Sequence, residues 1–289
     1  MLLVLHGGLH KTASTYFQNL LLLNQAGLRA RRVYVEPDTL LPANHGTAWM
    51  ALQDDFRHVE AHVRQAIKFG CESMILSSED FEGLIFTPAK AAALEAVARA
   101  AGATGIEWHF CLRDPGEAFA SMYAELSRHQ YVDFLAMSVI VLRDGKVRLD
   151  RPAKRLPRHW ELCFDYARYL TPFAQQISGS LRLHDFRDGD PYPGHRMLEA
   201  VTGADFVPTL PGANARNSRP EDAEVGANLV AQLDLIAADA GLPDEVREAW
   251  LAHSSVSPEI QRACEATISR KFAPGMEALF AQWAVSRAA

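Results

Sequence analysis

Short runs of consecutive apolar residues alternate, in the first half of the chain, with stretches in which apolar residues recur every three or four positions. The first pattern predicts buried strands, and the second predicts amphipathic helices. The predicted strands are Leu2–His6, Arg32–Val35, Ser73–Ser77, Ile106–Leu112 and Leu181–Leu183, and the predicted helices are Thr12–Asn24, Gln53–Phe69, Pro88–Ala101 and Pro115–Ser127. Strands separated by helices indicate βαβ units. We therefore expect an α/β fold with a parallel sheet of about five strands, flanked by helices.

The second half of the chain follows a different pattern. In Ser138–Asp150, two β-rich runs flank Asp144-Gly145, which predicts a β-hairpin. Residues 143–158 hold seven Lys or Arg against two Asp, typical of a solvated surface and also suited to a lid over a polar acceptor. The last third, residues 221–289, predicts three helices: Ala223–Ala240, Pro243–Leu251 and Pro258–Ser286. We expect one domain over 1–289, with a core in 1–135, an inserted hairpin and basic loop in 138–160, and C-terminal helices.

Composition narrows the class of protein. The chain has 289 residues, of which 48% are hydrophobic and 22% charged, as in ordinary globular proteins. A net charge of −6 argues against a general nucleic-acid binder. The four cysteines form no CxxC pair, which favours reduced thiols. The sequence has neither an apolar run long enough to cross a membrane nor a basic signal-peptide start, so we expect a cytoplasmic protein. Nothing in the sequence indicates the oligomeric state.

The stretch GGLHKTAST, residues 7–15, joins the first predicted strand to the first predicted helix. A helix N-terminus that follows a glycine turn is an anion site, because free N–H groups and the positive helix end face the ligand. Gly7 and Gly8 would allow close backbone approach and positive φ. Lys11 adds charge, and Thr12, Ser14 and Thr15 add hydroxyls. A Walker loop needs glycine before the lysine, whereas His10 stands there. The alternative interpretation is an ordinary turn with a solvated lysine.

A second segment, EWHFCLRDPGEAFASMY, residues 107–123, ends a strand at Arg113. Asp114 suits the N-cap of the next helix, and Pro115 suits its first turn. Arg113 then lies at the carboxyl end of a strand, where open α/β sheets bind ligands. Ser121, eight positions later, could share a phosphate with it. The alternative is that Arg113 pairs with Asp114 or Glu117 and that Ser121 is a small packing residue.

Together the two segments resemble the sulfotransferases that use 3′-phosphoadenosine 5′-phosphosulfate (PAPS), especially their bacterial branch. Lys11-Thr12-Ala13-Ser14-Thr15 is similar to the family motif K-[ST]-G-[ST]-[ST]. Arg113-Asp114-Pro115 with Ser121 is similar to the family's R-[DN]-P motif and its later serine. The segment Asn214–Leu229 resembles the family's late nucleotide loop, which adds Asn217 and Ser218 as candidates. The resemblance implies a P-loop-like fold.

The resemblance also implies roles for these residues. Lys11, Ser14 and Thr15, with Gly8 and Thr12, would hold the 5′-phosphosulfate, and Arg113 and Ser121 would hold the 3′-phosphate. PAPS would be the donor substrate, no metal would be needed, and the acceptor would be a hydroxyl or amine of a small molecule, carbohydrate or lipid. Ala13 replaces the family's glycine. We expect alanine to be tolerated, because φ at a helix start is negative.

The resemblance also makes Glu79 the first candidate for the general base that takes the acceptor's proton, because the buried strand that carries the family's catalytic residue ends here in Ser77-Ser78-Glu79-Asp80. The alternative is that this cluster only caps a helix. His10 and His45 are further candidates for the catalytic machinery. Trp49 and Trp160 could stack on a sugar, although core positions are the commoner role. Two other functions stay open: a P-loop kinase using ATP and Mg²⁺ held by Asp80, and a nucleotide-binding module without activity.

Overall fold

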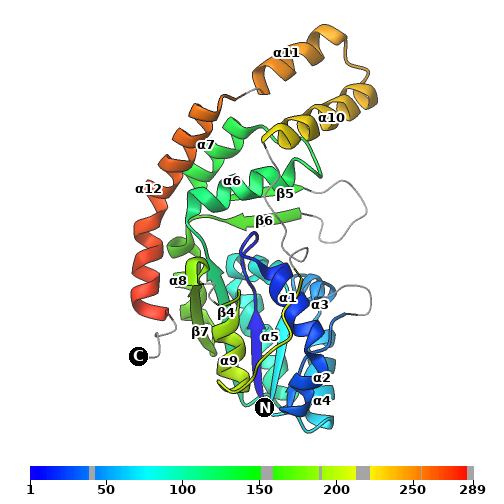
Figure 1. The fold of residues 1–289 in the computed structure, drawn as a ribbon, viewed down its shortest axis with the longest axis vertical. Helices are drawn as coiled ribbons and strands as arrows, with labels where there is room; N and C mark the ends of the chain where they lie inside the picture. Colours follow the sequence, from blue (N-terminus) through cyan, green and yellow to red (C-terminus); the bar gives the residue numbers. More distant parts are fainter. Residues whose placement is uncertain (39–42, 151–158, 189–190, 213–221, 255, 285–289) are drawn as a thin grey trace.

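A computed structural model describes residues 1–38, 43–150, 159–188, 191–212, 222–254 and 256–284. Its main sheet has five parallel strands in the order β2-β3-β1-β4-β7 (Figure 1). Their bounds are β1 Leu2–His6, β2 Val33–Tyr34, β3 Ser73–Ser77, β4 Gly105–Leu112 and β7 Ser180–Asp185. The predicted α/β fold with about five parallel strands is confirmed.

Helices cover both faces of this sheet. The elements of the α/β part are α1 Ser14–Leu23, α2 Gln25–Ala30, α3 His45–Ala51, α4 Arg57–Lys68, the 3₁₀ helix η1 Glu79–Phe86, α5 Pro88–Ala100, α8 Tyr166–Gln176, the 3₁₀ turn η2 Phe186–Asp188 and α9 His195–Thr202. On one face, Leu5, Leu76 and Trp108 pack with residues of α4, α5 and α8. On the other face, Val4 and Ile75 pack with α1, α2 and α9. Strands buried on both faces explain why their sequences read as continuous apolar runs.

A second core lies beyond the carboxyl ends of the strands. It combines α6 Pro115–Leu126, α7 Phe134–Asp144, the antiparallel pair β5 Lys146–Asp150 and β6 His159–Cys163, and parts of α10 Asp222–Ala240 and α12 Pro258–Trp283. Phe119, Phe134 and Phe164 are fully buried there. Figure 1 shows this second core directly above the sheet, so the strand ends face it.

The predicted hairpin over Ser138–Asp150 is wrong in its first half. Residues up to Asp144 belong to α7, which Asp133 caps by accepting a hydrogen bond from the Ala136 N–H at 2.7 Å. Gly145, with φ 69°, ends this helix in the left-handed conformation, so Asp-Gly forms a helix terminus and not a hairpin turn. Only the second run, β5, is a strand, and its partner is β6. Residues 151–158 of the predicted basic loop lie outside the described residues.

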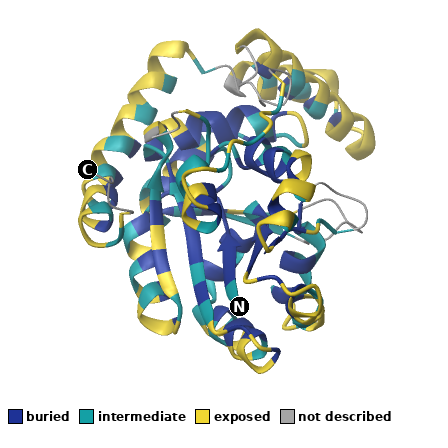
Figure 2. Ribbon diagram, turned by 60° about the horizontal axis from the view of Figure 1, so that its bottom comes forward, coloured by how far each residue is buried: buried dark blue, intermediate teal, exposed yellow. Residues whose placement is uncertain are grey.

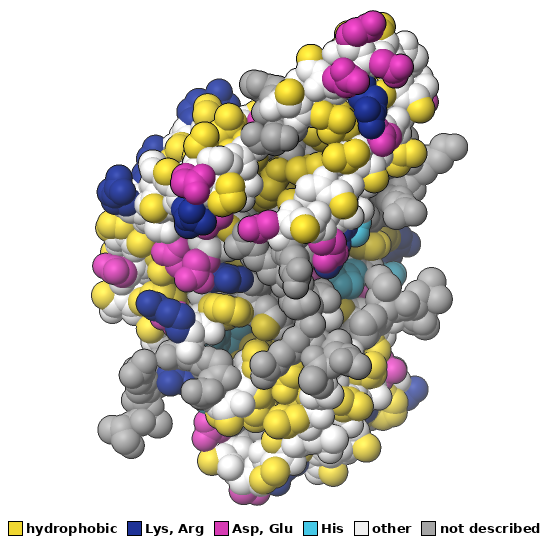
Figure 3. Space-filling model, turned by 45° about the horizontal axis from the view of Figure 1, so that its top comes forward, with side chains coloured by type: hydrophobic (Ala, Val, Ile, Leu, Met, Phe, Trp, Pro, Cys, Tyr) yellow, Lys and Arg dark blue, Asp and Glu magenta, His cyan; other side chains and the backbone are white. Residues whose placement is uncertain are grey.

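The C-terminal region is helical, as predicted, and consists of α10, α11 Asp244–Ser254 and α12. α12 packs along α6, α7 and α8, whereas α10 and α11 form an arm that projects from the body (Figure 1). Figure 2 shows the sheet strands largely buried and this arm largely exposed. Apolar side chains such as Leu235 and Trp250 lie on the surface of the arm, where Figure 3 shows hydrophobic groups among the charged ones. Among the described residues, no helix is long and apolar enough to span a membrane.

Candidate active site

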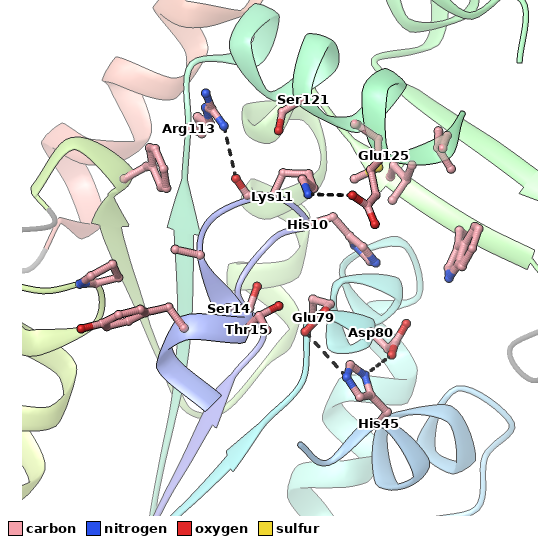
Figure 4. Close-up of a pocket in the computed structure, with 18 of the residues that line it drawn as sticks. His10, Lys11, Ser14, Thr15, His45, Glu79, Asp80, Arg113, Ser121 and Glu125 are labelled. Carbon is pink, nitrogen blue, oxygen red and sulfur yellow. Dashed lines mark hydrogen bonds and ion pairs between the residues drawn. The ribbon is translucent and has the colours of Figure 1, made fainter. Parts of the chain in front are cut away.

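A cavity of about 710 Å³ lies between the carboxyl ends of the strands and the second core. After β1 the chain turns toward β2 on one side of the sheet, and after β4 it continues to β7 on the other side. Adjacent strands whose connections leave in opposite directions open a crevice between them, where open α/β sheets bind ligands. Lys11 follows β1 and Arg113 follows β4, and both line this cavity (Figure 4).

The loop after β1 holds two non-glycine residues in the left-handed conformation. Lys11 has φ 66°, and Ala13, at the N-cap of α1, has φ 63°. The expectation that φ at Ala13 is negative is therefore wrong. Each such residue costs about 1–2 kcal/mol, and strain of this kind concentrates at functional sites. Left-handed residues that alternate with ordinary ones turn successive N–H groups to one side and form a concave site for anions.

The loop's glycines serve close packing. Neither Gly7 nor Gly8 has a positive φ, contrary to our expectation. A Cβ at Gly7 would lie 2.6 Å from Cε1 of Phe110, and a Cβ at Gly8 would lie 2.5 Å from Nε2 of His6. Larger residues would push the loop away from the strand ends. Gly8 itself does not line the cavity.

The hydroxyls of the loop divide into two groups. Ser14 and Thr15, at the start of α1, line the cavity with Lys11. Thr12 does not: it is 5% exposed, and its hydroxyl donates to the carbonyl of Leu9 at 2.5 Å. Thr12 therefore closes the loop and is not placed to contact a ligand in this cavity.

The Lys11 side chain extends across the cavity to α6. Its Nζ lies 3.1 Å from Oε2 of Glu125, as Figure 4 shows. Burial would raise the pKa of Glu125, but the charges of Lys11 and Arg128 and a hydrogen bond from Lys11 outweigh it and lower the pKa. Glu125 is thus ionised at neutral pH and partly neutralises Lys11.

Arg113 and Ser121 face the same cavity from β4 and α6. Arg113 lies with its guanidinium 4.8 Å from the ring centre of Phe186, and its Nε is 3.1 Å from Oε2 of Glu117. The alternative pairing with Glu117 is therefore present, but Glu117 is 61% exposed, which leaves a weak ion pair that a ligand can replace. Asp114 caps α6 as predicted, since it accepts hydrogen bonds from the N–H groups of Gly116 and Glu117.

His45 is brought into the cavity by α3, a helix that the sequence pattern did not predict. Asn44 precedes α3; its N–H donates to the carbonyl of Ser77 at 2.8 Å, and its side-chain oxygen accepts from the Ser77 N–H at 3.0 Å. These bonds attach the start of α3 to the end of β3. His45 consequently lies next to Glu79 and Asp80, which begin η1.

Two carboxylates surround His45. Nδ1 of His45 is 2.5 Å from Oδ2 of Asp80, and Nε2 is 4.0 Å from Oε2 of Glu79 (Figure 4). Burial lowers the pKa of His45, but the bond to Asp80 and the charges of Glu79 and Asp80 outweigh it, so the pKa is raised. Ser78, not Glu79, caps η1, by accepting from the Asp80 N–H. Glu79 accepts a hydrogen bond from Gln18 at 2.7 Å and faces the cavity.

His10 also lines the cavity, held by a carboxylate that the sequence did not single out. Both its backbone N–H and its Nδ1 contact Oε2 of Glu82, at 3.1 and 2.7 Å. Burial would lower the His10 pKa, but Glu82, assisted by Asp80 and Glu79, raises it to about 9. His10 is therefore a cation at neutral pH. Glu82 is 2% exposed and also accepts from the Cys163 N–H at 2.6 Å.

Three histidines of the sheet lie behind the loop, of which His6 and His109 are buried. His6 of β1 and His109 of β4 are paired in register, and Nδ1 of His109 lies 2.9 Å from Nε2 of His184 on β7. Burial, with the neighbouring His109, lowers the pKa of His6 to about 3, and burial also lowers the pKa values of His109 and His184. These histidines are neutral, in contrast to His10.

The structure thus brings together most of the residues predicted from the sequence. The cavity is lined by His10, Lys11, Ser14, Thr15, His45, Glu79, Arg113 and Ser121. Trp49 and Trp160 also line it. Asn217 and Ser218 lie outside the described residues. Among the described residues, no group of three or more His, Cys, Asp or Glu is placed to hold a metal ion.

Sequence reasoning missed Glu82 and Glu125. A signal for Glu125 was present, because it follows Ser121 by one helical turn and so shares its face of α6. Glu82 had no such signal, since its partners come from two distant segments. Comparison of the chain with family models, with curated proteins and with solved structures found no match.

Proposed function

We propose that the protein transfers a sulfuryl group from PAPS to a hydroxyl or amine of an acceptor. The observation that carries the proposal is that two cations line the same crevice: Lys11 in the loop after the central strand β1, and Arg113 after the neighbouring strand β4. Two cations that line one concave site suit a ligand with two separate phosphate groups. The 5′-phosphosulfate would lie at Lys11, Ser14 and Thr15, and the 3′-phosphate at Arg113 and Ser121.

The chemistry follows from the charges around the cavity. The acceptor's oxygen or nitrogen forms a bond to sulfur, the bond from sulfur to the bridging phosphate oxygen breaks, and adenosine 3′,5′-bisphosphate leaves. Lys11 and the His10 imidazolium would stabilise the charge that develops on this oxygen. Glu79 would accept the acceptor's proton. Asp80 holds His45, and Nε2 of His45 lies 4.0 Å from Oε2 of Glu79, where it would help to orient that carboxylate.

The arrangement favours this proposal over the kinase alternative. A kinase would need an acid free to hold Mg²⁺ at the phosphates. Asp80, the candidate for that role, is 7% exposed and bonds to His45 and Ser78. The P-loop-like fold remains part of the proposal, supported by the loop after the central strand of the sheet.

Thermal stabilisation by nucleotides tests the proposal. A ligand at 100 times its Kd adds about 2.7 kcal/mol to the free energy of unfolding. We expect adenosine 3′,5′-bisphosphate to raise the Tm more than ADP at equal concentration, with no effect of EDTA. A larger shift by ADP that requires Mg²⁺ would overturn the proposal. Turnover of PAPS with an acceptor then separates an enzyme from a binding module.

A further inference from the structure

A second cavity, of about 870 Å³, adjoins the first. The two share His10, Trp49, Asp80 and Trp160 in their walls. Small-molecule sites occupy about 300–1,000 Å³, so each cavity has the size of a ligand site of its own. The donor proposed above accounts for the part of the first cavity between Lys11 and Arg113. The second cavity begins on the other side, beside Asp80 and Trp49, where the acceptor would approach.

The two tryptophans lie at the junction of the cavities. Trp49, on α3, has its ring centre 6.0 Å from that of His45, and Trp160, on β6, lies 6.2 Å from the ring of His129. The Nε1–H of Trp49 is buried and has no hydrogen-bond partner among the described residues. A buried donor left unpaired costs about 1–3 kcal/mol. A ligand with hydroxyl oxygens at the junction would supply the missing acceptor.

The cations among the described residues of the second cavity are each paired with a carboxylate. These cations are His10, Lys90, Lys146 and Arg148, and the carboxylates of the lining are Asp80, Asp150 and Glu161. His10 is paired with Glu82 at 2.7 Å. Lys146 lies 2.9 Å from Glu161, and Arg148 lies 3.6 Å from Asp150. Lys90 is paired with Asp54 at 2.9 Å. An alkyl chain would remove water from these groups without replacing its hydrogen bonds, which is unfavourable. A polyanion would have to displace the carboxylate partners of these cations, so a neutral, hydroxyl-rich ligand fits best.

We propose that the second cavity binds the non-reacting units of a neutral oligosaccharide, the acceptor of the reaction proposed above, on which this inference rests. Sugar rings have apolar C–H faces and polar edges. The faces stack on Trp49 and Trp160, and the edges bond to the Trp49 N–H and to the paired charged groups. The chain's terminal unit then reaches the first cavity and presents one hydroxyl to Glu79.

Binding of neutral oligosaccharides, measured on protein saturated with adenosine 3′,5′-bisphosphate, tests the inference without requiring turnover. The probes are two series, β-1,4-linked glucose and β-1,4-linked N-acetylglucosamine, each from one to five units, with 2-naphthol, 1-dodecanol and a tyrosine peptide beside them. We expect at least one sugar series to gain tenfold or more in affinity between one and three units. Binding of neither series, or tighter binding of the peptide or the alcohol, would overturn the inference.

Variants assign the binding to the junction. Trp160→Ala and Trp49→Ala should lower trisaccharide affinity tenfold or more, while the affinity for adenosine 3′,5′-bisphosphate stays unchanged. Trp49→Phe keeps a ring but loses the N–H, so it should show a smaller loss. Trp250→Ala, on α11, is the matched control and should change nothing. Equal losses in all three variants and the control would contradict the assignment. If no probe is sulfated but trisaccharides bind as described, the proposed reaction fails while this site stands.

Discussion

The two halves of the first cavity are built in different ways. The half proposed to bind the donor, here the donor half, consists of residues that follow β1 and β4, and the register of these strands places Lys11 and Arg113. The half proposed to bind the acceptor, here the acceptor half, takes His45 from α3, Glu79 from η1 and Trp160 from β6, none of which belongs to the main sheet. The sheet therefore determines the donor half, whereas connecting segments determine the acceptor half. Function on a scaffold of this kind can change by altering loops while the donor half stays the same.

The sharpest difference between the halves concerns Glu79. Glu79→Gln removes a proton acceptor but keeps the size of the side chain, so kcat should fall by about 10²–10⁴. The affinity for adenosine 3′,5′-bisphosphate, measured by calorimetry, should stay within twofold. Glu60→Gln, on the exposed side of α4, is the matched control and should retain turnover. Full activity of Glu79→Gln would leave Glu79 with a structural role.

Arg113→Ala should change nucleotide binding, whereas Glu79→Gln should change kcat. The guanidinium faces the proposed 3′-phosphate, and a hydrogen bond to a charged group contributes about 1.5–3 kcal/mol. The preference for adenosine 3′,5′-bisphosphate over AMP should therefore fall by roughly tenfold to a hundredfold. Arg64→Ala, on the exposed side of α4, provides the control. An unchanged preference, measured by calorimetry, would remove Arg113 from the nucleotide site and dissolve the distinction between the halves.

The pKa values of His6 and His10 are shifted in opposite directions, so the two residues should affect stability at opposite ends of the pH range. His6, with a pKa of about 3, binds fewer protons folded than unfolded, so the free energy of unfolding falls as pH drops from about 6.5 toward 3. His10, with a pKa of about 9, binds more protons folded; its contribution is complete below about 6.5 and is lost as pH rises through 9.

Urea unfolding across this pH range, with His6→Gln and His10→Gln, measures the two effects. Each group changes the free energy of unfolding by at most about 1.4 kcal/mol per pH unit. His6→Gln should flatten the acid side of the stability profile, and His10→Gln the alkaline side. Profiles parallel to that of the unchanged protein would contradict both assignments.

The smallest expected effect concerns the loop backbone. Ala13→Gly removes the left-handed penalty of about 1–2 kcal/mol and adds about 0.4–1 kcal/mol of chain entropy to the unfolded state. We therefore expect a net stabilisation of about 0.5–1 kcal/mol in urea unfolding. Ala96→Gly, in the middle of α5, should instead destabilise by about 1 kcal/mol. Destabilisation in both variants would mean that Ala13 is not strained.

The donor half could be predicted because its signals are local. An apolar run, a glycine pair and a lysine lie within fifteen residues, and Arg113 with Asp114 and Pro115 marks a strand end and a helix start. The acceptor half could be predicted only as a set of candidates. The position of His45 depends on Asn44 bonding to Ser77, and the charge of His10 depends on Glu82, 72 positions away. Such contacts leave no periodic pattern in the sequence.

Two errors have a common origin. Asp144-Gly145 was interpreted as a hairpin turn and Ala13 as an ordinary helix start, although both Gly145 and Ala13 are left-handed residues at a helix end. Residue type alone identified neither conformation, because glycine serves both helix termini and tight turns and alanine is uncommon in the left-handed region. Asp133 would have identified the start of α7, since an Asp directly before an apolar run is a helix-start signal. In the structure, Asp133 accepts a hydrogen bond from the Ala136 N–H.

The central position of β1 in the sheet has a consequence for synthesis of the chain. Its two neighbours are β3 and β4, so β1 has unpaired backbone groups on one edge until Leu112 has been made, roughly a hundred residues later. At about 5–20 residues per second, this interval is roughly 5–20 seconds. During it, the apolar Leu2–His6 segment and the strained loop behind it have no sheet to join on that side. The nascent chain therefore carries a five-residue strand with an unpaired edge over this interval, and the proposed ligand site cannot form before it ends.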